Sequence, residues 1–101
     1  MSMLEIPIAS SEPYFSQENH IFGKSYNFTF EWIERENFWA LHLYDEVERP
    51  VALGIRLIAN WPLFRHREVS TTFFLIPKTP NIEPKLETLQ SDFMLVASDA
   101  L

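Results

Sequence analysis

The hydrophobic positions of this chain recur mainly with a period of two. Between residues 26 and 32, the aromatic side chains alternate with polar ones; they are Tyr26, Phe28, Phe30 and Trp32. The same alternation runs through Phe38 to Tyr44 and through Val51 to Ile58. Because successive side chains of a β-strand point to opposite faces of a sheet, each segment predicts a strand with one buried face. Polar breaks at residues 34–37 and 45–50 separate the three, so we expect an antiparallel meander.

The inward positions of the second and third strands form the predicted core. These positions are Trp39, Leu41, Leu43, Leu53, Ile55 and Leu57. Gly54 lies within the third strand, where a glycine predicts a bulge or the close approach of another backbone. Arg56 shares the opposite face with Ala52 and Gly54, and a lone guanidinium there needs an acceptor once water is excluded. Two acceptors are considered for this guanidinium: a carboxylate or carbonyl within the same protein, or an acidic group on a neighbouring subunit.

The remaining segments are less regular. The polar stretch 9–19 predicts a loop, and residues 61–64 an apolar corner. Further strands are expected at 69–76 and at 92–97, the latter apolar on both faces. Pro77, Pro80 and Pro84 predict a loop that extends to residue 91, with one short helical turn at 86–89.

Composition favours one small all-β domain that spans residues 1–101. Of the 101 residues, 47% are hydrophobic and 15% aromatic, which is enough to close one core without disulfides or a metal. Aromatic side chains also favour strands. The expected architecture is therefore an antiparallel β-barrel or sandwich built on the meander.

Two segments are poorly suited to a regular position inside a sheet. Residues 1–8 contain Pro7 and residues 77–91 contain the prolines named above, and proline cannot donate a ladder hydrogen bond. Both segments nevertheless carry apolar side chains, namely Leu4, Ile6, Ile8 and Ile82. We expect either that they dock on partner proteins or that they wrap around their own domain. The predicted protein-binding residues are Leu4, Ile6, Ile8, Arg56 and Ile82.

Charge and cysteine content exclude several classes of function. The net charge is −6, which disfavours a surface that follows nucleic-acid phosphates. The cluster Arg65 to Arg67 is the one basic group of residues, and it predicts a polar loop or a weak contact site. No segment resembles a signal peptide or is long enough to cross a membrane, so we expect a soluble protein. With no cysteine, the chain suits a reducing cytoplasm.

No pattern of residues predicts catalysis, a cofactor or a metal site. Two glycines, Gly23 and Gly54, cannot form a nucleotide-binding loop. His20, His42 and His66 lie in separate segments, without the close spacing that preassembles a metal site. The aromatic strand 26–32 could instead line a cavity, so the alternative function is a free-standing small β-barrel that binds an apolar or aromatic ligand.

Set end to end, these segments resemble a family of phage-tail proteins. The opening Ile6-Pro7-Ile8, the aromatic strand 26–32 and the segment 38–45 are similar to parts of the baseplate plug proteins of contractile-tailed phages. The strand Leu53-Gly54-Ile55-Arg56-Leu57, followed by Trp61-Pro62-Leu63, resembles the core of that family. Two features depart from it: residues 58–61 lack the frequent glycine, and the proline-rich stretch 77–84 is longer.

This resemblance implies a function in assembly. The protein is expected to be a plug-like structural component of a phage or prophage tail baseplate, made in the cytoplasm of the bacterial host. Its partners would be other baseplate and tail proteins, such as tail-tube, hub or wedge proteins, in several copies per particle. The family implies no catalytic residues.

Overall fold

A computed structural model describes residues 3–60, 62–66, 71–80 and 82–98 of the chain. Within them the chain forms eight strands and one short helix. The strands are β1 (Met3–Ile6), β2 (Tyr14–Ile21), β3 (Lys24–Ile33), β4 (Phe38–Tyr44), β5 (Pro50–Arg56), β6 (Pro62–His66), β7 (Thr71–Pro77) and β8 (Phe93–Ser98), and the helix is α1 (Leu89–Asp92). None of the described helices is long and apolar enough to cross a membrane.

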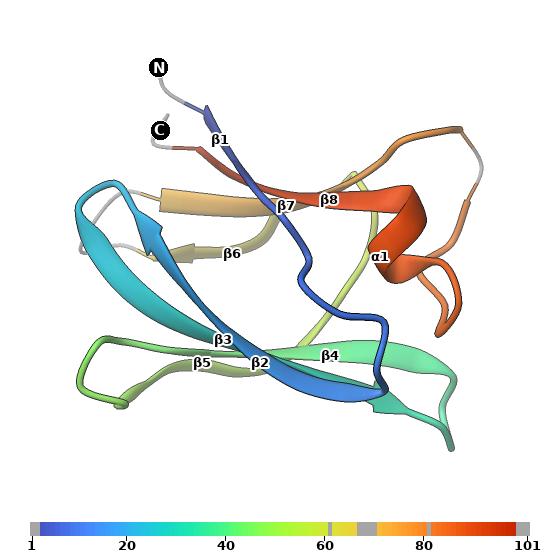
Figure 1. Ribbon diagram of the computed structural model, residues 1–101, viewed down its shortest axis with the longest axis horizontal. Coiled ribbons are helices and arrows are strands. Elements are labelled where there is room, and N and C mark those ends of the chain that lie inside the picture. The colour runs from blue at the N-terminus through green and yellow to red at the C-terminus, as the bar shows by residue number, and fades with distance from the viewer. Residues whose placement is uncertain (1–2, 61, 67–70, 81, 99–101) are drawn as a thin grey trace.

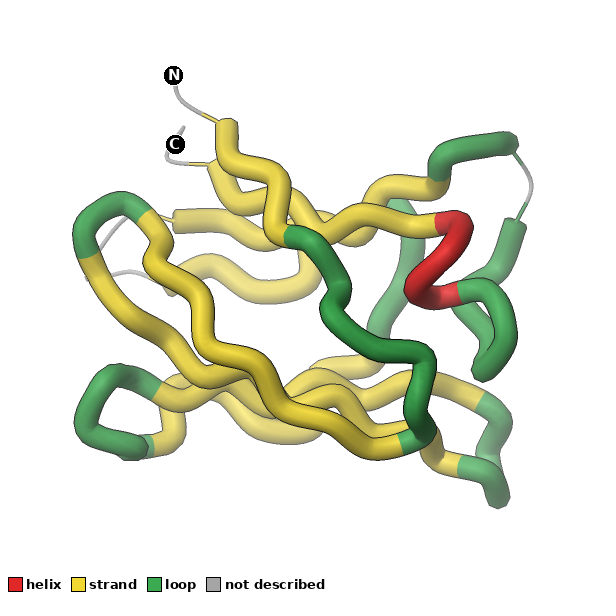
Figure 2. Tube along the Cα trace, viewed as in Figure 1, coloured by secondary structure: helices red, strands yellow, loops and turns green. Residues whose placement is uncertain are grey.

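The strands form two antiparallel sheets that face each other (Figure 1). We call the sheet with order β1-β8-β7-β6 sheet A and the sheet with order β2-β3-β4-β5 sheet B. The tube in Figure 2 shows the two layers, with α1 and the loop before it at one end. The prediction of an all-β antiparallel fold is confirmed, and of the two expected architectures the protein adopts the sandwich.

The predicted meander is confirmed in β3, β4 and β5. Phe28 pairs with Leu43 and Phe30 with Leu41, and all four side chains are buried. The alternation in sequence therefore gives the face of sheet B that points toward sheet A. The turn between β3 and β4 contains Asn37 with a positive φ of 62°, a conformation that asparagine tolerates better than most residues.

The loop predicted at residues 9–19 is wrong for its second half, where β2 pairs with β3 along its whole length. Phe22 and Gly23 join the two strands, and both have positive φ, as a tight two-residue hairpin turn requires. The strand escaped prediction because two of its inward positions are polar, Gln17 and Asn19. The sequence does offer one indication of this strand: Phe15 and Ile21 lie an even number of positions apart, as on one face of a strand, and a glycine suited to a turn follows.

A bulge in β5 corrects the predicted core. Leu41 pairs with Ile55 and Leu43 with Ala52, so that Leu53 and Gly54 together lie opposite one residue of β4. The extra residue shifts the alternation, and Leu53 is 56% exposed instead of buried. The bulge predicted at Gly54 is confirmed, and its φ of +68° suits a glycine.

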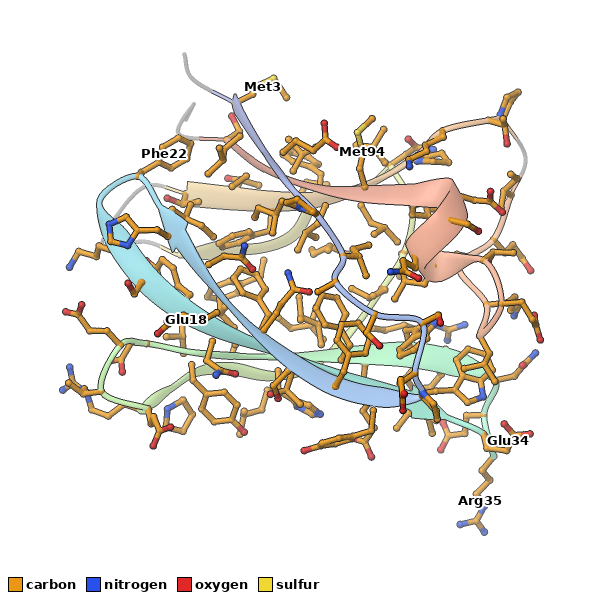
Figure 3. The ribbon with its side chains drawn as sticks, in the orientation of Figure 1. Met3, Glu18, Phe22, Glu34, Arg35 and Met94 are labelled. Carbon is orange, nitrogen blue, oxygen red and sulfur yellow. The ribbon has the colours of Figure 1, made fainter. Side chains whose placement is uncertain are left out.

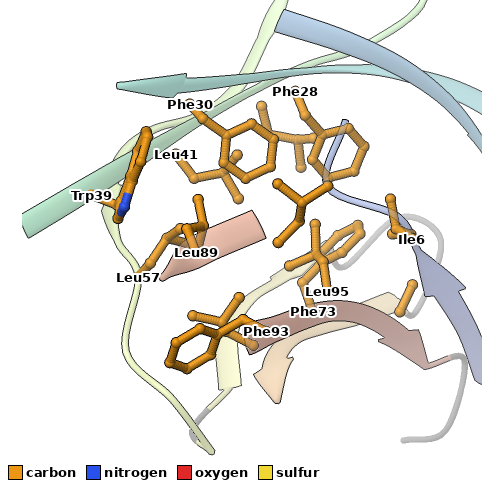
Figure 4. Packing of buried hydrophobic residues seen from close by; sticks show 14 of the residues in the cluster. Ile6, Phe28, Phe30, Trp39, Leu41, Leu57, Phe73, Leu89, Phe93 and Leu95 are labelled. Atoms are coloured by element: carbon orange, nitrogen blue, oxygen red, sulfur yellow. The ribbon is translucent and has the colours of Figure 1, made fainter. Parts of the chain in front are cut away.

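The core fills the space between the two sheets (Figure 4). Its largest fully buried side chains include Trp39, Tyr26, Phe28, Phe30, Phe73 and Phe93. Their rings meet at angles that aromatic pairs prefer: Phe28 meets Phe73 edge-on at 5.9 Å, and Phe15 stacks on Phe30 at 4.7 Å. Both sheets therefore share one aromatic core.

The second half of the chain matches its prediction in part. The predicted strands 69–76 and 92–97 correspond to β7 and β8, with residues 69–70 outside the described part. Residue 61 of the predicted corner lies outside the described part, and residues 62–64 belong to strand β6 instead, where Phe64 stacks on Phe73 and the strand pairs with β7. The expected helical turn at 86–89 is α1, three residues later along the chain.

Candidate docking surfaces

The five predicted protein-binding residues divide into two groups. Ile6 and Ile8 are only 1% and 7% exposed, because β1 pairs with β8 and both side chains enter the core. Leu4 packs against the same core. The N-terminal segment therefore follows the alternative in which it wraps its own domain. Its binding to a partner stays a prediction.

Arg56 and Ile82 come together at one end of the sandwich. They line a cleft of about 250 Å³ with Phe38, Ile58, Ala59 and Pro84. The cleft lies where the end of β5 meets the proline-rich loop. We call it the Arg56 cleft. Two predicted residues that are distant in the sequence thus belong to one surface.

The proline-rich loop is held against sheet B by hydrogen bonds from buried and half-buried side chains. The indole Nε1 of Trp39 donates to the carbonyl oxygen of Lys85 at 2.8 Å. Nζ of Lys85 in turn donates to the carbonyl oxygen of Asn37 at 3.2 Å. These contacts keep the wall formed by Ile82 and Pro84 at a defined distance from β5.

Arg56 lies on the solvent side of β5 with its guanidinium carbon 4.8 Å from the centre of the Phe38 ring. Among the residues that the structure describes, it makes no hydrogen bond or ion pair. The internal carboxylate or carbonyl considered as its acceptor is absent there, because the side chain is exposed at the edge of sheet B and water solvates it. An acidic group on a neighbouring subunit stays a prediction.

The outer side of sheet A is apolar across three strands, and sequence reasoning did not select it as a binding site. Phe73, Leu75, Phe93 and Leu95 are buried, so the alternate residues of β7 and β8 point outward. These outward residues pair across strands, Val96 with Phe74 and Met94 with Ile76, and Phe74 pairs with Pro62 of β6. We call the set Pro62, Phe74, Ile76, Met94 and Val96 the apolar face.

The apolar face is partly open to solvent on the described part of the molecule. Figure 1 shows no described element beyond sheet A on that side, and Figure 3 shows Met94 pointing away from the core. Phe74, Ile76 and Met94 are half-buried, Pro62 is exposed, and Val96 is buried, at 8% exposure. The sequence does indicate this face, because two successive predicted strands are apolar at both odd and even positions. A sheet that buries only one face needs apolar residues at alternate positions alone.

The outer side of sheet B carries hydrogen-bonded polar groups instead. The hydroxyls of Ser16 and Thr29 are 2.8 Å apart. The Gly54 N–H donates to Nδ1 of His42 at 3.0 Å, so the neutral ring carries its proton on Nε2, which lies 3.1 Å from a carboxylate oxygen of Glu31. These polar groups satisfy one another, which makes the middle of this side a weaker candidate for docking than the apolar face.

The turn between β4 and β5 is organised by Asp45. The pKa of this carboxyl group is lowered, first because the Arg49 N–H donates to it, and also by the Val47 N–H and the Arg49 guanidinium. The side chain is half-buried, with 24% of its surface exposed. These contacts all lie within the turn, which the carboxyl group therefore stabilises.

The described residues contain no group of side chains arranged to hold a metal ion. Of the two histidine side chains that the structure describes, His20 hydrogen-bonds to Ser25 at 2.9 Å, and His42 contacts Gly54 and Glu31. The predicted contact cluster Arg65 to Arg67 lies outside the described side chains. The aromatic strand proposed to line a ligand cavity is packed, with Phe28 and Phe30 at 0% exposure.

Comparison with known proteins gives one result that covers almost the whole chain. The family described as cyanophage baseplate Pam3 plug gp18 matches residues 3–100. None of the curated proteins matches the chain.

Proposed function

Since this chain belongs to the phage baseplate plug family, we propose that it docks against tail-tube, hub or wedge proteins of its own particle through the apolar face. The family makes it a structural component of a phage tail baseplate that associates with other tail or baseplate proteins. Its work would then be steric and adhesive and not catalytic. We further propose that each particle carries several copies, made in the cytoplasm of the bacterial host.

The observation that carries this proposal is the apolar face. A sheet with one side against a core needs polar residues on its other side, yet Phe74, Ile76 and Met94 occupy that side. Contiguous apolar patches on a soluble protein mark sites of interaction. Protein interfaces likewise have an apolar centre depleted of charge and a polar rim. Glu5, which pairs with Val96 at the edge of the face, would belong to the rim.

The test is an association measurement with purified tail-tube, hub and wedge proteins of the same phage. Phe74→Glu places a charge in the centre of the face and is expected to weaken the binding of at least one of them by about tenfold or more, which is about 1.4 kcal/mol. Ile76→Lys should weaken the same association. The matched control is Tyr14→Glu, which alters a residue that is 63% exposed on the outer side of sheet B.

Thermal melting of each variant separates lost binding from lost folding. Docking through the apolar face would be contradicted if Phe74→Glu and Ile76→Lys both bound the partner proteins as tightly as the wild type while Tyr14→Glu did not bind them. Native mass measurement addresses the alternative of a ligand carrier. A monomer that retains a small molecule and binds none of the three proteins would overturn the proposal.

A further inference from the structure

We infer that the Arg56 cleft is a second docking site, which receives an extended segment of a partner protein with a carboxylate beside apolar side chains. The inference rests on the proposed docking function only for the source of the segment, a neighbouring protein of the baseplate. The cleft and the apolar face share no residue, so each can be tested without the other.

The guanidinium of Arg56 is oriented but not satisfied. Its guanidinium carbon lies over the Phe38 ring, 4.8 Å from the ring centroid, in a cation–π contact. The N–H donors of a guanidinium lie in its plane and point outward from its edges, in the fork that matches the two oxygens of a carboxylate. The contact with Phe38 therefore restricts the side chain, while no described residue accepts a hydrogen bond from its donors. A carboxylate that arrives from outside finds a partly preorganised partner.

The charges around the cleft favour a bound segment that carries an acidic side chain. Lys85 contributes a second cation, which lies 3.7 Å from the carboxylate of Glu83 and is partly neutralised by it. Arg56 has no such acid among the described residues. The net charge of −6 repels an acidic partner at long range, but salt screens this repulsion beyond about 8–10 Å. At contact, the attraction between Arg56 and the carboxylate of the partner therefore outweighs the repulsion.

The remaining lining of the cleft selects apolar neighbours for that acid. Ile58 is 48% exposed at the mouth, and Ile82 and Pro84 form the opposite wall. The volume of about 250 Å³ is smaller than the roughly 300–1,000 Å³ typical of sites for small molecules. It suits one or two side chains of an extended segment better than an enclosed ligand.

The experiment follows the amide and Arg56 side-chain signals by nuclear magnetic resonance during titration with synthetic peptides. The probes are acetylated, amidated Val-Ile-Asp-Ile-Val and the same peptide with Asn or Lys in the central position. The Asp peptide should shift the signals of Arg56, Ile58 and Ala59 and bind about tenfold more tightly than the Lys peptide. Arg56→Gln should abolish this preference, whereas Arg35→Gln, at an exposed position in the β3–β4 turn, should preserve it (Figure 3).

Equal binding of the three peptides, or a preference for Asp that survives Arg56→Gln, would overturn the inference. So would shifts of the same signals by a decadeoxythymidine oligonucleotide but not by the Asp peptide, since the cleft would then recognise phosphate. Either failure leaves the association that depends on Phe74 unaffected. Loss of that association with an intact peptide preference would instead refute the proposed function alone.

Discussion

The side-chain amide of Gln17 donates to the carbonyl oxygen of Pro7 at 2.8 Å, and its oxygen accepts the N–H of Ala9 at 2.9 Å. Gln17 lies in β2, an edge strand of sheet B, and Pro7 follows β1, an edge strand of sheet A. One side chain thus satisfies backbone groups across the open side of the sandwich. The ladder between β1 and β8 ends at Ile6, so the Pro7 carbonyl lies beyond it, and Gln17 supplies a donor for this carbonyl.

Removal of this link should loosen the N-terminal segment. Gln17→Ala is expected to lower the free energy of unfolding by about 1–2 kcal/mol and to speed hydrogen exchange of the Ala9 amide. Glu18→Ala, at the neighbouring exposed position, is the control and should change neither quantity. If the Ala9 amide exchanged equally fast in both variants, the link would have no role in ordering this segment.

The hydrogen bond from Trp39 to Lys85 joins residues 46 positions apart and should stabilise the fold. Trp39→Phe leaves a small cavity and removes the hydrogen bond to the Lys85 carbonyl, which then keeps only the bonds from within its own loop, so we expect a loss of about 2–4 kcal/mol in chemical denaturation. Trp32→Phe is the matched control, because the Trp32 indole donates to the exposed carboxylate of Glu34 and the ring is only half-buried. Its expected loss is below about 1 kcal/mol. Equal losses would mean that the proline-rich loop is not held through Trp39.

Because of the bulge in β5, we expect Leu53 and Ile55 to contribute differently to stability, although the alternation in the sequence places both in the core. Ile55→Ala should cost about 1–2 kcal/mol, since Ile55 is half-buried against the core. Leu53→Ala, at a side chain 56% exposed, should change the free energy of unfolding by less than about 0.5 kcal/mol. Chemical denaturation of the two variants compares them directly. If Leu53→Ala lowered the free energy of unfolding more than Ile55→Ala, β5 would pair with β4 without a bulge.

The fold follows from the sequence where inward positions are apolar without exception, as in β3 and β4. It fails to follow at β2, because Gln17 and Asn19 occupy inward positions with hydrogen bonds that no pattern of hydropathy records. The Arg56 cleft is unpredictable for another reason. Arg56 and Ile82 line one cleft because hydrogen bonds from Trp39 and Lys85 hold the loop before α1 against sheet B, and those bonds depend on the tertiary fold.

The β4–β5 turn should respond to acid. Because the folded pKa of Asp45 is lowered, the ionised group stabilises the turn above its ordinary pKa of 3.8, and this stabilisation is lost as the pH falls through the lowered folded value. Relative to Asp45→Asn, the wild type should be more stable at pH 7, with the difference vanishing in strong acid. Glu46→Gln removes an equal charge in the same turn but none of the hydrogen bonds from Val47 and Arg49, and should keep the wild-type pH dependence. A difference from Asp45→Asn that is constant with pH would contradict this role.

Hydroxyl-radical footprinting of the assembled baseplate, compared with the isolated protein, tests docking through the apolar face most directly. Met94 and Phe74 are reactive side chains of this face, and Tyr14, 63% exposed on the outer side of sheet B, provides the internal reference. The account predicts that assembly strongly reduces the oxidation of Met94 and Phe74 and leaves that of Tyr14 nearly unchanged. Unchanged oxidation of Met94 and Phe74 in the assembled baseplate, with Tyr14 protected, would contradict it.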